Sequence, residues 1–222
     1  FPKGGSQIIQ QHGKVNGYSL CGGPLDPEDM PRGEMPDEEL AAWASERLAA
    51  EYDEPFFLAV GFARPHVPYT APRKYFDLYD PATLVLPEVP EDEFFDIPVL
   101  GKAMALCTLP GGDHWFVTHK MGPDYWRHLV HSYLACVSFV DDQVGKVVTA
   151  LDNSQYADNT VIVLWSDHGQ HLGEKKHWRK MCLWEESTKV PMLWVLPDRK
   201  NSGRVCSRPV SLVDIYPTIS DI

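Results

Sequence analysis

Residues 126–165 carry the pattern that most restricts the fold of this chain. A polar turn separates a helical stripe from the unbroken apolar run Val161–Trp165, and Val190–Leu196 is a second such run. Continuous apolar strands next to helices are typical of a mostly parallel sheet with helices on both faces, so the pattern predicts an α/β fold. The stripe recurs at steps of three and four, as on one face of a long helix: Trp126, Val130, Tyr133, Val137, Val140, Val144, Val147 and Leu151.

Weaker patterns predict the remaining segments. Residues 1–35 are rich in Gly, Pro and polar groups, which indicates an irregular surface segment. Asp37 is placed to cap a helix that runs through Ala50, and Phe56–Val60 is expected to be a strand. Residues 81–123 hold many prolines, glycines and acids, which indicates a long irregular excursion that shapes a substrate pocket. A last helical stripe comprises Leu212, Ile215, Ile219 and Ile222.

The composition excludes several classes of protein. With 222 residues, 44% hydrophobic and 23% charged, the chain suits one globular domain with a core of its own. Its net charge of -11 and the lack of a long Lys/Arg run argue against a nucleic-acid partner. No apolar run approaches the roughly 20 residues of a transmembrane helix. The five cysteines form no C-x-x-C pair, so we expect most of them to be small buried hydrophobes.

Polar residues follow the first apolar run at the place where α/β proteins collect ligands. Asp167 and His168 come directly after Val161–Trp165, and both can turn toward one divalent cation. The alternative is that Asp167 caps the next turn and His168 bonds to the backbone. A zinc site through His168, His171 and His177 is a weaker hypothesis, because two intervening glycines argue against the helix that this spacing needs.

A dense cationic patch lies just downstream, in Gly173–Lys180. Four cations against one acid give this stretch a net charge of +3 within a chain of -11. A solvated surface turn is the plain interpretation of such a run. The tryptophans Trp178 and Trp184 indicate instead that part of it is held against the core. Arg64 and His66 follow another expected strand, so the two strand ends together predict a site for an oxyanion.

These stretches resemble a known family. Ser166–Lys180, continued by Leu183–Pro191, is similar to the formylglycine-dependent sulfatases, in particular to the iduronate-2-sulfatase-like branch of the alkaline phosphatase superfamily. Leu58–Tyr69, Tyr133–Gly145 and Val210–Thr218 resemble further segments of that branch. The resemblance implies an alkaline phosphatase/sulfatase-like fold, a sulfated carbohydrate substrate, calcium, and an exported location in the periplasm, outside the cell or in lysosomes.

The resemblance also assigns roles to single residues. It implies that Asp167 and His168 are calcium ligands, that Lys180 grips a sulfate oxygen, and that His66 holds sulfate or protonates the leaving oxygen. Sulfuryl transfer places negative charge on these oxygens, where a divalent cation, an ammonium and an imidazole donor stabilise it. The motifs contain two further residues, Arg64 and His171, whose role is either substrate binding or structural.

The nucleophile of that family is missing from its expected context. It is a cysteine in C-x-P-S-R or C-x-A-S-R that becomes formylglycine, and neither Cys107 nor Cys206 fits that order. The pair Asp141-Asp142 lies within the predicted long helix, which favours structural roles over metal binding. We therefore expect residues 1–222 to be a partial sulfatase catalytic domain whose nucleophile-bearing N-terminal part and C-terminal part lie outside this sequence.

Two other functions stay open from the sequence. The first is a non-catalytic sulfatase-like protein that binds anionic glycans through the surviving basic patch. The second is a phosphoester or phosphonate hydrolase of the same superfamily, because the nucleophile that would distinguish it is not in this chain. The oligomeric state is left open as well.

Overall fold

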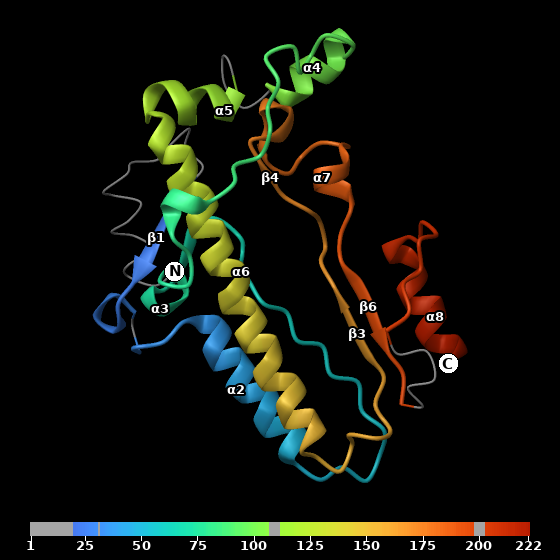
Figure 1. The fold of residues 1–222 in the computed structure, drawn as a ribbon. Helices are drawn as coiled ribbons and strands as arrows, with labels where there is room; N and C mark the ends of the chain where they lie inside the picture. Colours follow the sequence, from blue (N-terminus) through green and yellow to red (C-terminus); the bar gives the residue numbers. More distant parts are fainter. Residues whose placement is uncertain (1–19, 31, 107–111, 198–202) are drawn as a thin grey trace.

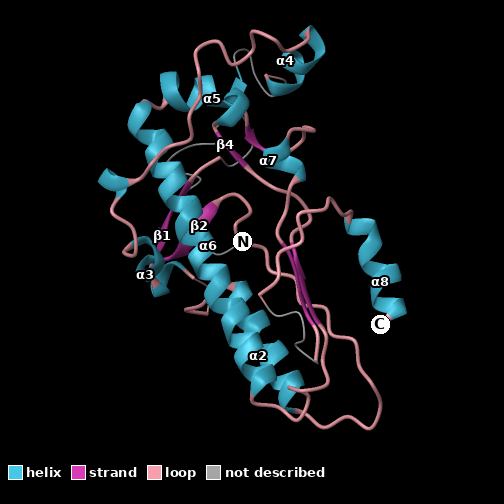
Figure 2. Ribbon diagram, turned by 45° about the vertical axis from the view of Figure 1, so that its right-hand side comes forward, coloured by secondary structure: helices cyan, strands magenta, loops and turns pink. Residues whose placement is uncertain are grey.

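The computed structural model describes residues 20–30, 32–106, 112–197 and 203–222 (Figure 1). The helices α2 (Pro36–Ala49) and α6 (Pro123–Asp152) lie side by side, next to a ribbon formed by β3 (Ile162–Trp165) and β6 (Met192–Val195). Helix α8 (Ile215–Asp221) lies on the other side of this ribbon, as Figure 2 also shows. Helices and strands thus alternate along the chain, which confirms the predicted α/β class.

The long helix α6 confirms the strongest prediction from the sequence. It has 30 residues, starts with Pro123 after a glycine at φ 92, and ends at Asp152. Its buried face, however, is shifted from the predicted stripe, because α6 packs on α2 and on the β1–β2 pair rather than on β3. Val137 of the predicted stripe is 38% exposed. Two members of the predicted stripe, Val130 and Leu151, are nevertheless buried, so the shift is partial. The buried residues of α6 are Tyr125, Leu129, Val130, Ser132, Ala135, Cys136, Phe139, Gln143 and Leu151.

Helix α2 forms where it was predicted, but Asp37 does not cap it. The N-cap is Met35, whose backbone N–H donates to Glu38 Oε2 at 2.8 Å. The buried carboxylate of Asp37 accepts instead from the backbone N–H groups of Ala63 and Arg64, both at 3.0 Å. Asp37 therefore ties the loop after residues 56–60 to the start of α2.

The strands pair differently from the predicted parallel sheet. Strand β1 (Gly22–Leu25) pairs with β2 (Tyr69–Pro72) in parallel, with Gly22 opposite Tyr69. The apolar strands β3 and β6 form as predicted, but they run antiparallel, with Ile162 opposite Val195. A short antiparallel pair, β4 (His171–Leu172) with β5 (Trp178–Arg179), follows β3. The described residues thus form three two-stranded sheets.

Two local predictions about strands were wrong. Residues 56–60 form no strand, since no backbone hydrogen bond joins them to another segment among the residues that the structure describes. Strand β1 lies within the stretch 1–35 that was expected to be irregular, while residues 1–19 are outside the described part. Its Gly-Gly-Pro-Leu sequence carries no strand signal, and its parallel partner β2 lies more than forty residues away.

About half of the described residues of the excursion 81–123 lie in helices, so this segment is less irregular than predicted. The C-terminal helical stripe forms η6 and α8, although α8 buries none of its residues. The remaining elements are η2 (Pro27–Asp29), α3 (Arg73–Phe76), η3 (Pro81–Thr83), α4 (Val99–Ala105), α5 (Gly112–Trp115), the π-helical η4 (Phe116–Lys120), η5 (Glu174–Lys176), α7 (Glu185–Thr188) and η6 (Leu212–Asp214).

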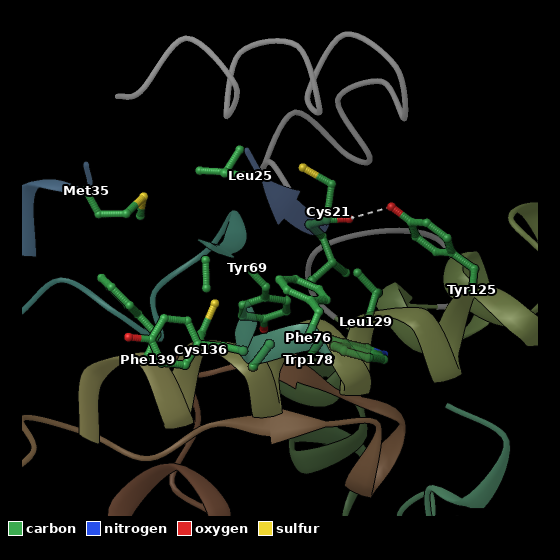
Figure 3. Packing of buried hydrophobic residues seen from close by; sticks show 14 of the residues in the cluster. Cys21, Leu25, Met35, Tyr69, Phe76, Tyr125, Leu129, Cys136, Phe139 and Trp178 are labelled. Atoms are coloured by element: carbon green, nitrogen blue, oxygen red, sulfur yellow. Dashed lines mark hydrogen bonds between the residues drawn. The ribbon is translucent and has the colours of Figure 1, made fainter. Parts of the chain in front are cut away.

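The main hydrophobic core lies between the β1–β2 pair and α6 (Figure 3). Tyr69, Leu129 and Phe139 are fully buried in it. Trp178 of β5 enters the same cluster and is 1% exposed, so the core anchors the segment that follows β3. Each fully buried large side chain stabilises the fold by roughly 1.5–3 kcal/mol relative to exposure.

Cysteine burial follows the prediction for two of the four described cysteines. Cys21 and Cys136 are buried, Cys182 is half-buried and Cys206 is exposed, while Cys107 lies outside the described residues. Among the helices of the described part, none combines the length and the hydrophobicity that crossing a bilayer requires.

Candidate active site

The end of β3 presents Asp167 and His168 side by side. Asp167 Oδ2 lies 3.6 Å from His168 Nε2, and the two side chains are 84% and 33% exposed. His168 Nδ1 is 2.7 Å from the carbonyl oxygen of Gly169, and because a carbonyl only accepts, Nδ1 carries the proton. Nε2 therefore keeps its lone pair toward the carboxylate. A carboxylate next to an imidazole oriented in this way suits a metal ion.

The contacts of the alternative interpretation are present in the same stretch. Asp167 Oδ1 accepts from the backbone N–H of His168 at 3.1 Å, and Ser166 Oγ donates to the carbonyl of His168 at 2.8 Å. Calcium takes about six to eight oxygen ligands. Within the described ranges, no three His, Cys, Asp or Glu side chains gather around one possible metal position. Asp167 and His168 thus fit part of a calcium shell only.

Residues 173–181 form a turn with an unusual backbone. Gly173 has φ 128, and the non-glycine residues Lys175, Lys176, Arg179 and Met181 have φ between 48 and 81. Side chains with a Cβ rarely adopt this left-handed conformation, which costs roughly 1–2 kcal/mol per residue. Contacts from the rest of the fold therefore have to hold this turn in place.

Three of the four cations in this turn are bound to the excursion 81–123. Lys175 Nζ lies 2.5 Å from Glu93 Oε1, and this hydrogen bond raises the pKa of Lys175. The carboxylate of Asp113 is 1% exposed. The sequence predicted that the excursion 81–123 shapes a pocket, but it did not identify Glu93 and Asp113 as partners of the turn. Their negative charge, in a chain that also carries a cationic run, was the only indication. The pairs are Lys175 with Glu93, Lys176 with the carbonyl of Glu91, and Arg179 with Asp113.

Lys180 differs from the other three cations. In the described part of the chain its ammonium has no hydrogen-bond acceptor and no ion-pair partner, and the side chain is half-buried. Its backbone is fixed, because its carbonyl oxygen lies 2.8 Å from Nε2 of His177, which is 1% exposed. The turn therefore holds a cation at a defined place without neutralising it.

His171 and His177 lie inside the fold and brace the turn. His171 is fully buried, with Nδ1 3.1 Å from the carbonyl oxygen of Glu174 and Nε2 3.2 Å from Cys182 Sγ. His177 Nδ1 lies 3.0 Å from the carbonyl oxygen of Ala105. The ring nitrogens of both histidines are thus engaged, which disfavours the zinc hypothesis. For His171 this arrangement favours structure over substrate binding.

The second predicted strand end carries Arg64 and His66. Arg64 is 8% exposed, and its guanidinium donates to the carbonyl and hydroxyl oxygens of Thr70 at 2.8 and 3.1 Å and to the carbonyl of His66 at 3.0 Å. These contacts favour a structural role, and substrate binding by Arg64 stays a prediction. His66 is exposed, with Nδ1 2.7 Å from the carbonyl oxygen of Val67. Among the residues that the structure describes, its Nε2 has no partner, so it can meet a ligand.

Tyr69 connects the loop 64–69 to the segment that follows β3. Its hydroxyl accepts from Gln170 Nε2 at 2.7 Å, which joins the 64–69 loop to the segment after His168. Burial raises the pKa of Tyr69, and the nearby charges of Arg179 and Asp113 also act on it. The loop that bears His66 and the segment that bears the predicted metal ligands are thus fixed to each other.

Neither cysteine weighed as the family nucleophile is seen to enter this arrangement in the described part of the chain. Cys206 is exposed on the segment before η6, and Cys107 lies outside the described part. Asp142 has the structural role expected from the sequence, since its Oδ2 accepts from the hydroxyl of Tyr75 at 2.5 Å and lies 3.6 Å from Lys146 Nζ. The hydrogen bond from Tyr75 lowers the pKa of Asp142.

Two curated relatives share a large part of this sequence. A sulfatase of Formosa agariphila is 42% identical over 188 residues, which cover 85% of this chain and 36% of that protein. Human iduronate 2-sulfatase is 33% identical over 218 residues, which cover 92% of this chain and 37% of that protein. The chain thus spans little more than a third of the length of these relatives.

A solved structure and a family model extend the comparison. The phosphonate monoester hydrolase SpPMH from Silicibacter pomeroyi superposes with a TM-score of 0.73 at 25% identity, covering 98% of this chain and 46% of that one. The family model described as Sulfatase matches residues 6–222. The chain therefore belongs to the sulfatase family.

Proposed function

We propose that the whole protein containing this chain hydrolyses sulfuric esters on a sugar or glycan. The observation that carries the proposal is the unpaired ammonium of Lys180, held in the turn 173–181 while, within the described part, its neighbouring cations are bound to acceptors. The adjacent side chains of Asp167 and His168, 3.6 Å apart after β3, support the proposal as candidate metal ligands. The name of the relative iduronate 2-sulfatase supports a sugar as the carrier of the sulfate.

The proposed roles follow from where charge develops during the reaction. Lys180 binds a sulfate oxygen through its ammonium, which has three donors and no acceptor. Because His66 Nδ1 donates to the carbonyl of Val67, Nε2 carries a proton only in the imidazolium form. In that form His66 donates to sulfate or gives a proton to the leaving oxygen, since imidazole exchanges protons near neutral pH. Fixed cations and donors at such oxygens stabilise the transition state more than the ground state.

Calcium and formylglycine complete this proposal. Asp167 and His168 would supply two ligands to a calcium ion, which would neutralise charge on the sulfate oxygens. The remaining ligands and the formylglycine nucleophile come, in this proposal, from a part of the protein outside this sequence. A piece limited to these 222 residues should therefore bind calcium weakly and should not turn over sulfate esters, and submicromolar calcium binding by calorimetry would contradict this ligand assignment.

The experiment separates the two catalytic residues by their chemistry. kcat/KM is measured for Lys180→Ala and His66→Ala of the whole protein on an alkyl sugar sulfate and on a nitrophenyl sulfate. Loss of one preorganised donor typically costs about 10²–10³ in kcat, so Lys180→Ala should lose this much on both substrates. His66→Ala should harm the sugar sulfate far more, because a nitrophenolate leaves without a proton.

A matched variant and clear contrary outcomes accompany this experiment. Lys189→Ala removes a lysine that is 76% exposed and paired with Glu185, so its kcat/KM should stay within about twofold of the unmodified protein. Equal losses of His66→Ala on the two substrates would restrict His66 to sulfate binding. Full activity of Lys180→Ala would remove the observation on which the proposal rests.

A second candidate is phosphonate or phosphate ester hydrolysis, favoured by the superposition on the phosphonate monoester hydrolase SpPMH. A ratio of kcat/KM for a nitrophenyl phenylphosphonate over a nitrophenyl sulfate well above one would favour it. No turnover of either ester, with Lys180-dependent binding to an immobilised sulfated glycan, would instead support a non-catalytic glycan-binding protein. We also propose, from the same family resemblance, that the protein is exported, which cell fractionation tests.

A further inference from the structure

Cys182 and His171 form a thiol–imidazole pair beneath the cationic turn. Cys182 Sγ lies 3.2 Å from His171 Nε2 and 3.2 Å from Ser187 Oγ. His171 is fully buried and Ser187 is 5% exposed, whereas Cys182 is half-buried. The sulfur thus rests on two buried polar side chains while part of the residue faces solvent. His171 belongs to the motif Ser166–Lys180, but Cys182 lies outside it, and the proposed sulfatase chemistry does not use this pair.

The hydrogen-bond partners of His171 define which atom carries the proton. Nδ1 is 3.1 Å from the carbonyl oxygen of Glu174, which can only accept, so Nδ1 is the protonated nitrogen. Nε2 therefore directs its lone pair at the thiol, and the S–H donates to it. The carboxylate of Glu186, at 3.9 Å from Nε2, is beyond hydrogen-bond distance. Burial lowers the pKa of His171, so the resting pair is a thiol donating to a neutral imidazole, and Nε2 accepts the proton only as sulfur attacks.

We propose that Cys182 is a reactive thiol, activated by His171 as a general base, that is modified by small carbon electrophiles. A nucleophile within hydrogen-bond reach of a base that a third group orients is the arrangement that activates cysteine. In the reaction, the thiol proton passes to His171 Nε2 while sulfur attacks the electrophilic carbon. An S–C bond forms, the bond from carbon to the leaving group breaks, and the leaving group departs with its electron pair. The imidazolium then returns its proton to water.

The other cysteines provide comparisons within the same molecule. Burial raises the pKa of Cys21 to about 11 and that of Cys136 to about 12, so both are unreactive while the fold is intact. Cys206 is more exposed than Cys182 and serves as the accessible reference thiol. If exposure alone governed reactivity, Cys206 would react first. If the histidine base governs it, Cys182 reacts first.

The test is alkylation of the whole protein by iodoacetamide at pH 7, followed by site-resolved mass spectrometry. An ordinary thiol reacts through its small thiolate fraction at this pH, whereas Cys182 can lose its proton to His171 during the attack itself. We expect Cys182 to react at least about fivefold faster than Cys206. His171→Gln replaces the base by an amide and should bring Cys182 down to the rate of Cys206 or below. His119→Gln, which changes an exposed histidine of η4, should leave the rate of Cys182 unchanged.

Labelling of Cys21 and Cys136 reports on the fold of each variant. If these two thiols stay unlabelled in His171→Gln and Cys182 still reacts as fast as before, the proposal is wrong. If they become labelled, the variant has unfolded. The proposal is then tested by the ratio of the alkylation rates of Cys182 and Cys206 in the unmodified protein. A ratio of one or less overturns the proposal in every case.

Discussion

Replacing Arg179 by alanine tests whether the buried ion pair with Asp113 holds the cationic turn. The carboxylate of Asp113 is 1% exposed and the side chain of Arg179 is 12% exposed, so the pair is shielded from water. It joins α5 to β5 across 66 positions in the sequence, next to Lys180. The variant removes the guanidinium from a carboxylate that the fold keeps buried, which is the costly way to break such a pair.

The expected magnitude follows from this burial. Removing one partner of a buried ion pair costs about 3–5 kcal/mol, a large part of the roughly 5–15 kcal/mol that stabilises a typical domain. With a urea dependence of about 2.5 kcal/mol/M, the midpoint of unfolding should fall by about 1–2 M. The left-handed backbone of Arg179, at φ 72, also loses the contact that opposes its strain.

Urea unfolding followed by circular dichroism measures this change, with Arg32→Ala as the matched control. Arg32 pairs with Glu39 at 2.9 Å, but its side chain is 73% exposed, so its loss should cost less than about 1 kcal/mol. Amide hydrogen exchange across residues 171–180 should also accelerate in Arg179→Ala alone. A midpoint shift no larger than that of Arg32→Ala would show that the pair does not hold the turn.

Three further predictions follow from other parts of the structure. Phe139→Ala should cost about 3–5 kcal/mol in urea unfolding, because this ring is fully buried in the core between α6 and the β1–β2 pair. Burial lowers the pKa of His114 to about 4, below the ordinary 6.5, so the unfolded chain binds the proton at a higher pH than the folded chain does. The free energy of unfolding should therefore fall as the pH drops from about 6.5 to about 4. His114→Leu should flatten this dependence in unfolding measured at several pH values. Gly169→Ala would place a Cβ 2.1 Å from the backbone oxygen of Glu186, so it should lower stability by about 1–3 kcal/mol in thermal unfolding and weaken calcium binding of the whole protein by displacing His168.

The elements that the sequence predicted correctly are those with strong local periodicity. The stripe along residues 126–151 predicted α6, and the apolar runs predicted β3 and β6, because a helix or strand repeats its environment within a few residues. The buried face of α6 was partly displaced from the predicted stripe, since apolar side chains cover more than one face of this helix. Which face is buried depends on the elements that pack against it, and these are distant in the sequence.

The chemical character of the candidate site is also visible in the amino-acid sequence. Asp167 and His168 could be proposed as metal ligands because two ligand types follow an apolar strand, and the cationic run stands out against a net charge of -11. The orientation of these side chains is not visible there. The tautomer of His168 depends on a backbone carbonyl, and the link from Tyr69 to Gln170 spans 101 positions.

By itself the sequence determined the α/β class, the family motifs and the list of candidate residues, because each depends on short-range spacing. Only the tertiary structure decided which cation of the turn stays unpaired within the described residues: the acceptors for Lys175 and Lys176 lie 82 and 85 positions away. It also placed Arg64 and His171 in structural contacts and brought Cys182 to His171. Charge and polarity are properties of single residues, whereas pairing and burial arise only when distant segments meet in the folded chain.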